Sequence, residues 1–368
     1  MNTQSSPHQL DVRALVSTQE VIAYKDGGLF PVLTQVLDGT IVAVLRGGAG
    51  HLGLDGRIEV IRSLDQGRTW SPPLIVADSE RDDRNPALGV SQQGTIILGY
   101  HCQGNYDAEG NYVREVESLA ERVEVRVTRS HDAGLTWETP YPLGLDSLRS
   151  GSPFGKIVTQ TDGTLLMAIY HPDGSFIVRS RDNGLTWGEP TLLAEKKNET
   201  ALVVLPNDEL LAVMRGEDDQ QALHSTHSTD GGYTWSPPVQ VTGARQHPGD
   251  LVVLSNGALL LTYGNRNPPY RIEGLVSQDN GHTWLNCLLT FSGPLYGANT
   301  AGPRPTDLGY PSSVICPKSG KGVTLYYYNP SINRPWHWAK RQHEARYWAR
   351  NYYAIAVTWD EAALLAAL

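Results

Sequence analysis

Arginine, histidine, acidic and tyrosine residues recur in this sequence beside short apolar runs that are typical of strands. They are Arg46, Asp83, Arg84, His101, Glu199, Arg215, His247, Arg266 and Tyr310. A cluster of arginines with few acidic partners favours an anionic ligand, because a guanidinium can hold a carboxylate through two parallel hydrogen bonds. The alternative is that these residues pair with one another and stiffen the rim of the fold.

A repeated octet predicts the elements that would position these residues. The pattern Ser-x-Asp-x-Gly-x-Thr-Trp starts at Ser63, Ser130, Ser180, Ser228 and Ser277. The starts lie 67, 50, 48 and 49 residues apart, which fits a four-stranded propeller blade better than a helical repeat. We expect the Asp to accept hydrogen bonds from N–H groups two or three residues on, the Gly to take a positive φ and the Trp to pack under the turn.

A second tight turn occurs six times between the octets, for example at Asp38-Gly39 and Asn256-Gly257. Such dipeptides between apolar runs are typical of β-hairpins. Together the two signals predict an all-β, six-bladed β-propeller with five octet hairpins. The sixth blade has no octet, and we expect its third strand at Tyr353–Trp359 and its outer strand at Glu20–Tyr24, which would close the ring without an exposed edge.

The predicted strand order places the titratable residues at one end of the ring. Both kinds of tight turn lie at one end, so residues before a first strand or after a second strand lie at the other, around the central depression. His51 and Asp55, in the loop between the second and third strands of the first blade, lie there too. Unpartnered burial costs on the order of several kcal/mol per charged group, so this convergence favours a ligand site.

The repeat favours one large domain over the two domains that the chain length alone would suggest. The chain has 368 residues, 40% of them hydrophobic, which is enough for a large core. We expect an extension over 1–19, a single propeller domain over 20–360 and a tail or short helix over 361–368. The net charge of −9, without a basic stripe, argues against nucleic acid or an anionic membrane as partner; the oligomeric state is left open.

Other patterns bear on location and cofactors. The first residues lack the basic and apolar regions of a signal peptide, and the three cysteines are widely spaced, so we expect a cytoplasmic protein. The histidines occur without His-x-x-x-His spacing, and the cysteines have no metal-ligand spacing. We therefore expect no metal and no other cofactor.

The octets resemble the Asp-box, or BNR, repeats of the sialidase superfamily. The six-bladed arrangement resembles the sialidase fold over residues 20–360. The repeat is more specific for the fold than for the activity, since other propellers also carry it. The resemblance implies an exo-acting glycosidase that holds a sugar carboxylate with three arginines and uses a tyrosine nucleophile paired with a glutamate, with an aspartate as acid and base.

Particular residues match this pattern by their order and blade. Glu199 and Arg215 resemble the family's glutamate and second arginine, and Tyr310 resembles its nucleophile. A free phenol has a pKa near 10, so the glutamate would take its proton. The third arginine would be Arg266 or Arg271.

Two features depart from the family pattern. The first arginine belongs to an Arg-Ile-Pro motif, and here that stretch is Leu29-Phe30-Pro31. Losing one charged hydrogen bond costs about 1.5 to 3 kcal/mol, although Arg46 could reach into the gap. The acid and base would be either Asp55 or His51, since a histidine titrates near neutral pH. Asp83, Arg84, His101 and His247 are further candidates for binding the ligand.

Two other functions use the same residues. A lyase acting on a uronic-acid glycan would neutralise the carboxylate with arginine and remove the neighbouring proton with tyrosine or histidine. A non-catalytic glycan-binding propeller would line its depression with exposed aromatic and amide groups rather than with a tyrosine and a glutamate in contact. In each case the expected partner is a carbohydrate, carrying an acidic group if the protein is an enzyme.

Overall fold

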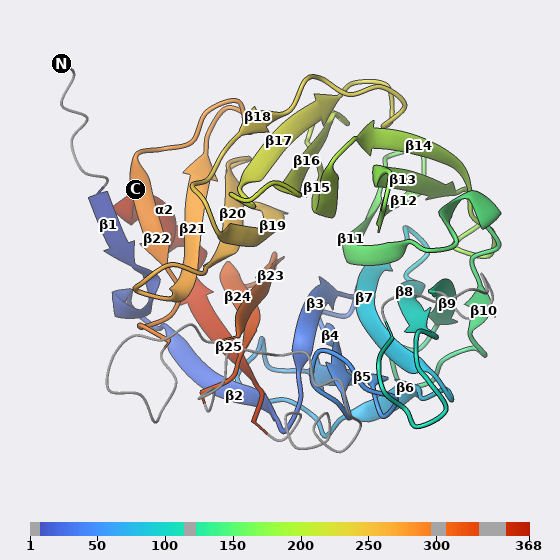
Figure 1. The fold of residues 1–368 in the computed structure, drawn as a ribbon. Coiled ribbons are helices and arrows are strands. Elements are labelled where there is room, and N and C mark those ends of the chain that lie inside the picture. The colour runs from blue at the N-terminus through green and yellow to red at the C-terminus, as the bar shows by residue number, and fades with distance from the viewer. Residues whose placement is uncertain (1–7, 114–122, 296–306, 331–350) are drawn as a thin grey trace.

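Short strands arranged around a central axis make up most of the fold (Figure 1). The computed structural model describes residues 8–113, 123–295, 307–330 and 351–368. The prediction of an all-β, propeller-like protein is confirmed. Helical structure within these ranges is limited to two single 3-10 turns, Val12–Ala14 and Asp146–Leu148, and the helix α2, Glu361–Ala367. In the described residues no helix is long and apolar enough to cross a membrane.

The described strands form five hydrogen-bonded sheets. The first contains β3 (Leu29–Gln35), β4 (Ile41–Gly47), β5 (Arg57–Ser63) and β6 (Leu74–Ala77). The second contains β7 (Asp82–Val90), β8 (Ile96–Gln103), β9 (Glu124–Ser130), β10 (Tyr141–Pro142), β11 (Ser152–Thr159), β12 (Leu165–His171), β13 (Gly174–Ser180) and β14 (Gly188–Ala194). The third contains β15 (Lys197–Val204), β16 (Leu210–Gly216), β17 (Leu223–Ser228) and β18 (Val239–Gln240). The fourth contains β1 (His8–Asp11), β19 (Gln246–Val253), β20 (Leu259–Asn265), β21 (Arg271–Ser277) and β22 (Cys287–Thr290). The fifth contains β2 (Gln19–Lys25), β23 (Leu308–Cys316), β24 (Lys321–Tyr328) and β25 (Tyr353–Asp360).

The sheets do not separate into the six independent blades that we expected. The second sheet has eight strands, because β7 and β11 pair in parallel at Gly155 with Ala87 and at Lys156 with Leu88. This short pairing joins two runs of four antiparallel strands, β7 to β10 and β11 to β14. The innermost strands β3, β7, β11, β15, β19 and β23 each contact the next around the axis, and β23 contacts β3, so the ring is closed.

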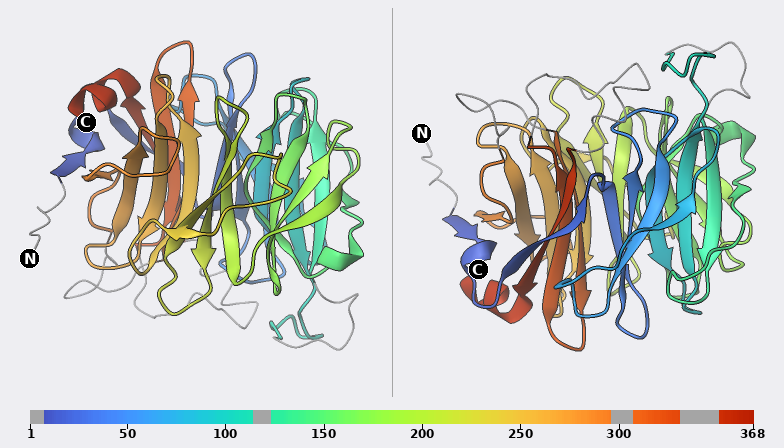
Figure 2. Two further views of the ribbon diagram at one scale, coloured as in Figure 1. Left: turned by 90° about the horizontal axis from the view of Figure 1, so that it is seen from above. Right: turned by 90° about the horizontal axis from the view of Figure 1, so that it is seen from below.

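The strands run along the ring axis, so their ends and connections form the two faces of a thick disc (Figure 2). As expected, an N-terminal strand completes the last sheet: β2 pairs antiparallel with β25, from Gln19 opposite Thr358 to Lys25 opposite Tyr353. Further out, β1 adds in parallel to β22. The segment 1–19 is thus partly built into the sheets.

The five octets form the corners between third and fourth strands, as predicted. In the copy at Ser228, the Asp230 carboxylate accepts a hydrogen bond from the Thr234 N–H at 2.9 Å and from the Thr234 hydroxyl at 2.6 Å. The carboxylate also accepts a hydrogen bond from the Tyr233 N–H, three residues on, at 3.0 Å, as expected, so the bonds from Thr234 extend the predicted pattern by one residue. Gly232 has φ 83°, and Trp235 donates its indole N–H to the Gly232 carbonyl at 3.1 Å.

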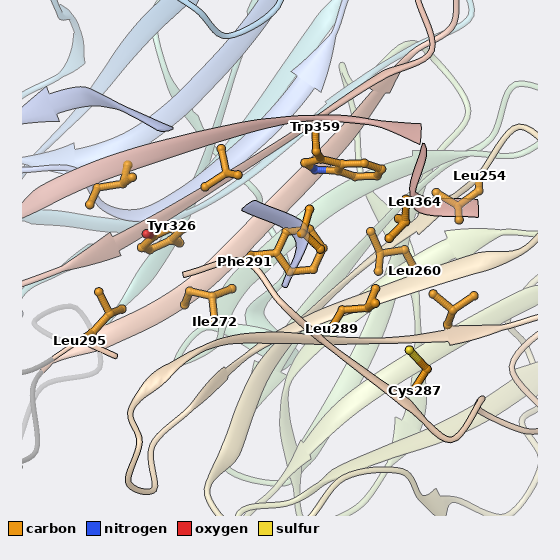
Figure 3. Packing of buried hydrophobic residues seen from close by; sticks show 14 of the residues in the cluster. Leu254, Leu260, Ile272, Cys287, Leu289, Phe291, Leu295, Tyr326, Trp359 and Leu364 are labelled. Atoms are coloured by element: carbon orange, nitrogen blue, oxygen red, sulfur yellow. The ribbon is translucent and has the colours of Figure 1, made fainter. Parts of the chain in front are cut away.

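Apolar side chains fill the spaces between neighbouring sheets. Figure 3 shows the cluster between the fourth and fifth sheets, where Phe291 and Trp359 lie 6.0 Å apart between ring centroids at 67°. Leu364 of α2 joins this cluster and is fully buried. Strands such as β21 and β25, which are buried along most of their length, supply these side chains, and the packed walls support the innermost strands.

Candidate active site

Each innermost strand is irregular near the end that faces the loops between second and third strands. Pairing with the second strand shifts register between Leu29 and Val32 in β3, and at corresponding places in β7, β11, β15, β19 and β23. Such bulges re-aim side chains and are common at the rims of barrels and beside active sites. We expected the candidate residues ahead of the first strands, whereas Asp83, Arg84, Glu199 and His247 lie inside these irregular strand ends.

Three of these irregular ends carry a non-glycine residue in the left-handed region. The φ angles are 54° at Phe30, 46° at Asn85 and 50° at Tyr310. Residues other than glycine rarely adopt such φ angles, and they do so mainly at functional sites where the surrounding structure holds them. The three residues are each followed by proline, and with Phe154 they line a hollow on the ring axis. Neither Glu199 nor any arginine lines that hollow, so we place the ligand site beside it.

Tyr310, Glu199 and Arg215 form one hydrogen-bonded group. The Tyr310 hydroxyl donates to Glu199 Oε1, and Arg215 Nη1 donates to Glu199 Oε2 at 2.9 Å. The side chains of Glu199 and Arg215 are 6% and 20% exposed. The three residues come from β23, β15 and β16, so the closed ring brings distant parts of the chain into contact.

The electrostatic surroundings keep the Tyr310 phenol protonated in the absence of a ligand. Burial raises the pKa of Tyr310 well above its ordinary value, and the negative charge of Glu199 raises it further. The positive charges of Arg266 and Arg215 lower the pKa in part. A carboxylate in hydrogen-bonding contact is then the natural acceptor for the proton when the phenol oxygen reacts.

Arg266, rather than Arg271, lies beside the tyrosine. The guanidinium carbon of Arg266 is 6.0 Å from the centroid of the Tyr310 ring. Its Nε and Nη2 are buried without a hydrogen-bond partner, which leaves them available to a ligand. Arg271 opens β21, and its charge acts on Asp11 and Glu273.

His51 lies in a polar network next to the aromatic side chains around Tyr310. Its Nε2 is 2.6 Å from Asp307 Oδ2, and Asp307 also accepts hydrogen bonds from Tyr327 at 3.0 Å and Tyr352 at 2.6 Å. The His51 ring is 5.1 Å from that of Phe30, which is 4.8 Å from that of Tyr310. Asp55 is half-buried in the same loop between β4 and β5.

Asp307 and Phe30 were not among our candidate residues. Asp307 directly precedes β23, which is the kind of position that the strand order had marked. Applied consistently, the same rule would have found it. Phe30 gave no such signal, because its place in the site depends on the left-handed backbone at that position.

Several predicted residues are engaged elsewhere. Arg46 is fully buried, and it binds Asp82 and the carbonyls of Gly50 and Asp83, at 2.7 and 2.8 Å for the carbonyls. It therefore does not fill the gap left at Leu29, and we leave it out of the ligand site. The Asp83 carboxylate accepts hydrogen bonds from the Ser79 N–H at 2.7 Å and its hydroxyl at 3.0 Å.

The two buried histidines are neutral. Burial and the charges of nearby arginines lower the pKa of His101 and of His247 far below the ordinary value. His101 contacts Gln103 at 3.2 Å, and both ring nitrogens of His247 lack a partner. They are 4% and 1% exposed, so neither presents its ring to an incoming sugar.

The comparison with known proteins gives a consistent picture. The family described as BNR repeat-like domain matches residues 16–326. Curated sialidases from Paraclostridium sordellii and Clostridium perfringens are 26% and 25% identical over 235 and 236 residues. Each match covers 56% of this chain and 56% or 59% of the relative, so it spans little more than half of either protein.

Solved structures share the fold over nearly the whole chain. A protein of unknown function from Dyadobacter fermentans superposes with a TM-score of 0.74 at 20% identity, over 94% of this chain and all of that one. A Trypanosoma rangeli sialidase in complex with 2,3-difluorosialic acid, described as a covalent intermediate, gives 0.63 at 16% identity, over 94% of this chain and 55% of that one. The prediction from the octets is confirmed: this chain belongs to the BNR repeat-like domain family, within the sialidase superfamily.

Proposed function

We propose that this protein is an exo-acting glycoside hydrolase that removes a carboxylate-bearing sugar, with Tyr310 as nucleophile and Glu199 as the base that activates it. The observation that carries the proposal is the hydrogen bond from the Tyr310 hydroxyl to Glu199, whose other oxygen binds Arg215. The curated sialidases that resemble this chain support a sialidase-like glycosidase. The Trypanosoma rangeli structure, described as a covalent intermediate, fits a nucleophilic mechanism.

The chemistry explains why a tyrosine is suited to this role. If the anomeric carbon of the sugar carries a carboxylate, a negatively charged nucleophile is repelled, whereas a neutral phenol is not. As the Tyr310 oxygen bonds to the anomeric carbon, its proton passes to Glu199 and the glycosidic oxygen leaves with a proton from an acid. Water then attacks the anomeric carbon and passes a proton to the conjugate base of that acid, while the bond to Tyr310 breaks and the Tyr310 oxygen recovers its proton from Glu199.

Two parts of the site have named candidates. Arg215 and Arg266 would bind the sugar carboxylate, because both lie next to Tyr310 and both keep a buried Nε without a partner. The acid that protonates the leaving oxygen would be His51 or Asp55, in the loop between β4 and β5. Counting the eight-stranded sheet as two units of four strands, we also assign the fold six blades.

The other two functions find less support. A lyase that used His101 or His247 as its base would need that ring to be accessible, and both rings are buried. A non-catalytic glycan-binding propeller would not need the contact between the half-buried Tyr310 and the buried Glu199, because burying these polar groups costs desolvation free energy.

The test is hydrolysis of aryl glycosides by the wild-type protein and by a Tyr310→Phe variant. We expect release of the chromophore from an aryl α-sialoside or from another carboxylate-bearing aryl glycoside. We expect the variant to lose that activity by a factor of about 10⁴ or more, since it lacks the nucleophile. Its far-ultraviolet circular dichroism should match that of the wild type.

Undiminished turnover by Tyr310→Phe would remove this residue from the mechanism. A lyase would instead produce an unsaturated sugar, detected by its ultraviolet absorbance on uronate polymers. Binding of these glycans with neither reaction would support the non-catalytic alternative.

A further inference from the structure

The first innermost strand contributes no positive charge to the candidate site. The described strand β3 contains no basic residue. Leu29, at the position of the family's first arginine, is fully buried and packs with Phe30, Tyr327 and Tyr352. The left-handed backbone at Phe30 turns its ring toward Tyr310, with 4.8 Å between centroids. The side of the site formed by β3 therefore presents aromatic rings and no cation.

The next innermost strand, β7, places a cation against the aromatic ring of Phe30. The guanidinium carbon of Arg84, in β7, is 5.7 Å from the centroid of the Phe30 ring. Arg266 approaches the neighbouring Tyr310 ring to 6.0 Å. The two arginines thus lie against the two members of one aromatic pair, and they come from different blades.

Arg84 has no counterion among the described residues. It is 8% exposed, and its Nε is buried without a hydrogen-bond partner. The two acidic residues before it are occupied, Asp82 by Arg46 and Tyr106 and Asp83 by Ser79. A guanidinium held this deep without a negative partner is unfavourable. Among the residues that the structure describes, Arg84 is therefore left able to bind an anionic ligand.

The residue after Arg84 ties it to the catalytic group. Asn85 Nδ2 donates to the Tyr170 hydroxyl at 2.6 Å. Burial and the charge of Glu199 raise the pKa of Tyr170, while the charges of Arg84 and Arg215 lower it. Arg84, Arg215 and Glu199 therefore act on the same phenol and belong to one electrostatic site.

We propose that Arg84 donates the third cationic contact to the substrate carboxylate, in place of the arginine missing at Leu29. This inference rests on the proposed function and specifies its ligand: a sugar whose carboxylate reaches across Phe30 to β7. In the family pattern given above, the first arginine lies on the first innermost strand. In this chain the third arginine would instead lie on β7, in the second sheet.

The test uses binding rather than turnover, so that it does not depend on catalysis. The probes are the 2,3-didehydro derivative of sialic acid, whose flattened ring resembles the transition state, and the same compound with its carboxylate converted to a carboxamide. Calorimetry on wild type, Arg84→Gln and Arg84→Lys gives the dissociation constants. The matched control is Arg181→Gln, because the Arg181 side chain is 53% exposed and pairs with Glu189 near the octet corners.

We expect Arg84→Gln to weaken binding of the carboxylate probe about 10- to 100-fold and to change carboxamide binding little. The dissociation constant of Arg84→Lys for the carboxylate probe should lie between those of the wild type and Arg84→Gln. The dissociation constant of Arg181→Gln should match that of the wild type. Without ligand, the thermal midpoint of Arg84→Gln should be no lower than that of the wild type, because the substitution removes an uncompensated buried charge.

Three results would overturn the inference: equal loss for both probes, carboxylate binding by Arg84→Gln as tight as that of the wild type at any thermal midpoint, or no binding of either probe by the wild type. The proposed hydrolysis is judged separately on the aryl glycosides. A wild-type protein that binds the carboxylate probe through Arg84 but hydrolyses no glycoside would retain the inference and lose the proposed function.

Discussion

The two carboxylate oxygens of Glu199 bind different groups, one a proton donor and the other a cation. Oε1 accepts from Tyr310 and Oε2 accepts from Arg215 at 2.9 Å. The arginine fixes the direction of the glutamate, while the raised pKa of Tyr310 keeps its phenol protonated. The same Arg215 would bind the substrate carboxylate, so arrival of the sugar and activation of Tyr310 are coupled through one guanidinium.

Single-residue variants can decide whether His51 or Asp55 is the acid. We expect His51→Ala to lower turnover of a sugar with a poor leaving group by about 10² to 10⁴, the usual contribution of general acid catalysis. An aryl glycoside with an acidic phenol should be affected far less, because its leaving oxygen needs no proton. The reason for favouring His51 is its 5.1 Å ring contact with Phe30, the neighbour of Tyr310.

The measurement is kcat and KM on both substrates, with Asp55→Ala as the matched variant. If Asp55→Ala shows the strong dependence on the leaving group and His51→Ala does not, the acid is Asp55. His51 would then be a structural partner of Asp307.

At the scale of elements, the octet corners should govern stability in acid. Hydrogen bonds from the side chain and N–H of Thr234 lower the pKa of Asp230 to about 2, from a usual 3.8, and Thr283 does the same for Asp279. The folded pKa lies below the unfolded one, so the stabilisation is present above the unfolded pKa. It is lost as the pH falls from about 4 toward 2.

Asp230→Asn should therefore destabilise the protein by about 1 kcal/mol near neutral pH and reduce the loss of stability between about pH 4 and pH 2. Urea unfolding at a series of pH values measures both effects. Asp219→Asn, at an exposed turn outside the octets, is the control. If the free energy of unfolding of Asp230→Asn falls as steeply with decreasing pH as that of the wild type, this corner does not contribute to the acid sensitivity.

The octets and tight turns could be predicted from the sequence because each is a local structure that its own residues determine. The hairpin order, the all-β class and the closing strand β2 all followed from them. The resemblance and the strand order also selected Tyr310, Glu199 and Arg215, which the structure brings into contact, while their catalytic roles stay a prediction. The sequence could not show that Arg46 binds Asp82, nor that Arg84 faces Phe30, because both contacts join strands of different sheets and the second involves the left-handed backbone at Phe30.

At the scale of the whole molecule, ring closure depends on contacts across the axis as well as between neighbours. Lys156 of β11 donates its ammonium to Asp250 Oδ2 at 2.9 Å and to the carbonyls of Leu251 and Ser313 at 2.8 and 2.7 Å. The Ser313 N–H also donates to Asp250 at 2.8 Å. One ion pair therefore links β11, β19 and β23, which belong to three different sheets.

Removing only the lysine should be costly. Lys156 and Asp250 are 17% and 7% exposed, so Lys156→Met leaves a buried carboxylate without its cation and should lower the free energy of unfolding by about 3 to 5 kcal/mol. The double variant Lys156→Met/Asp250→Asn should recover part of that loss, because asparagine is uncharged and can still accept from Ser313. Chemical denaturation of the wild type, both single variants and the double variant gives the coupling energy. Additive losses would mean that the ion pair does not couple the three strands, and that packing alone holds the ring closed.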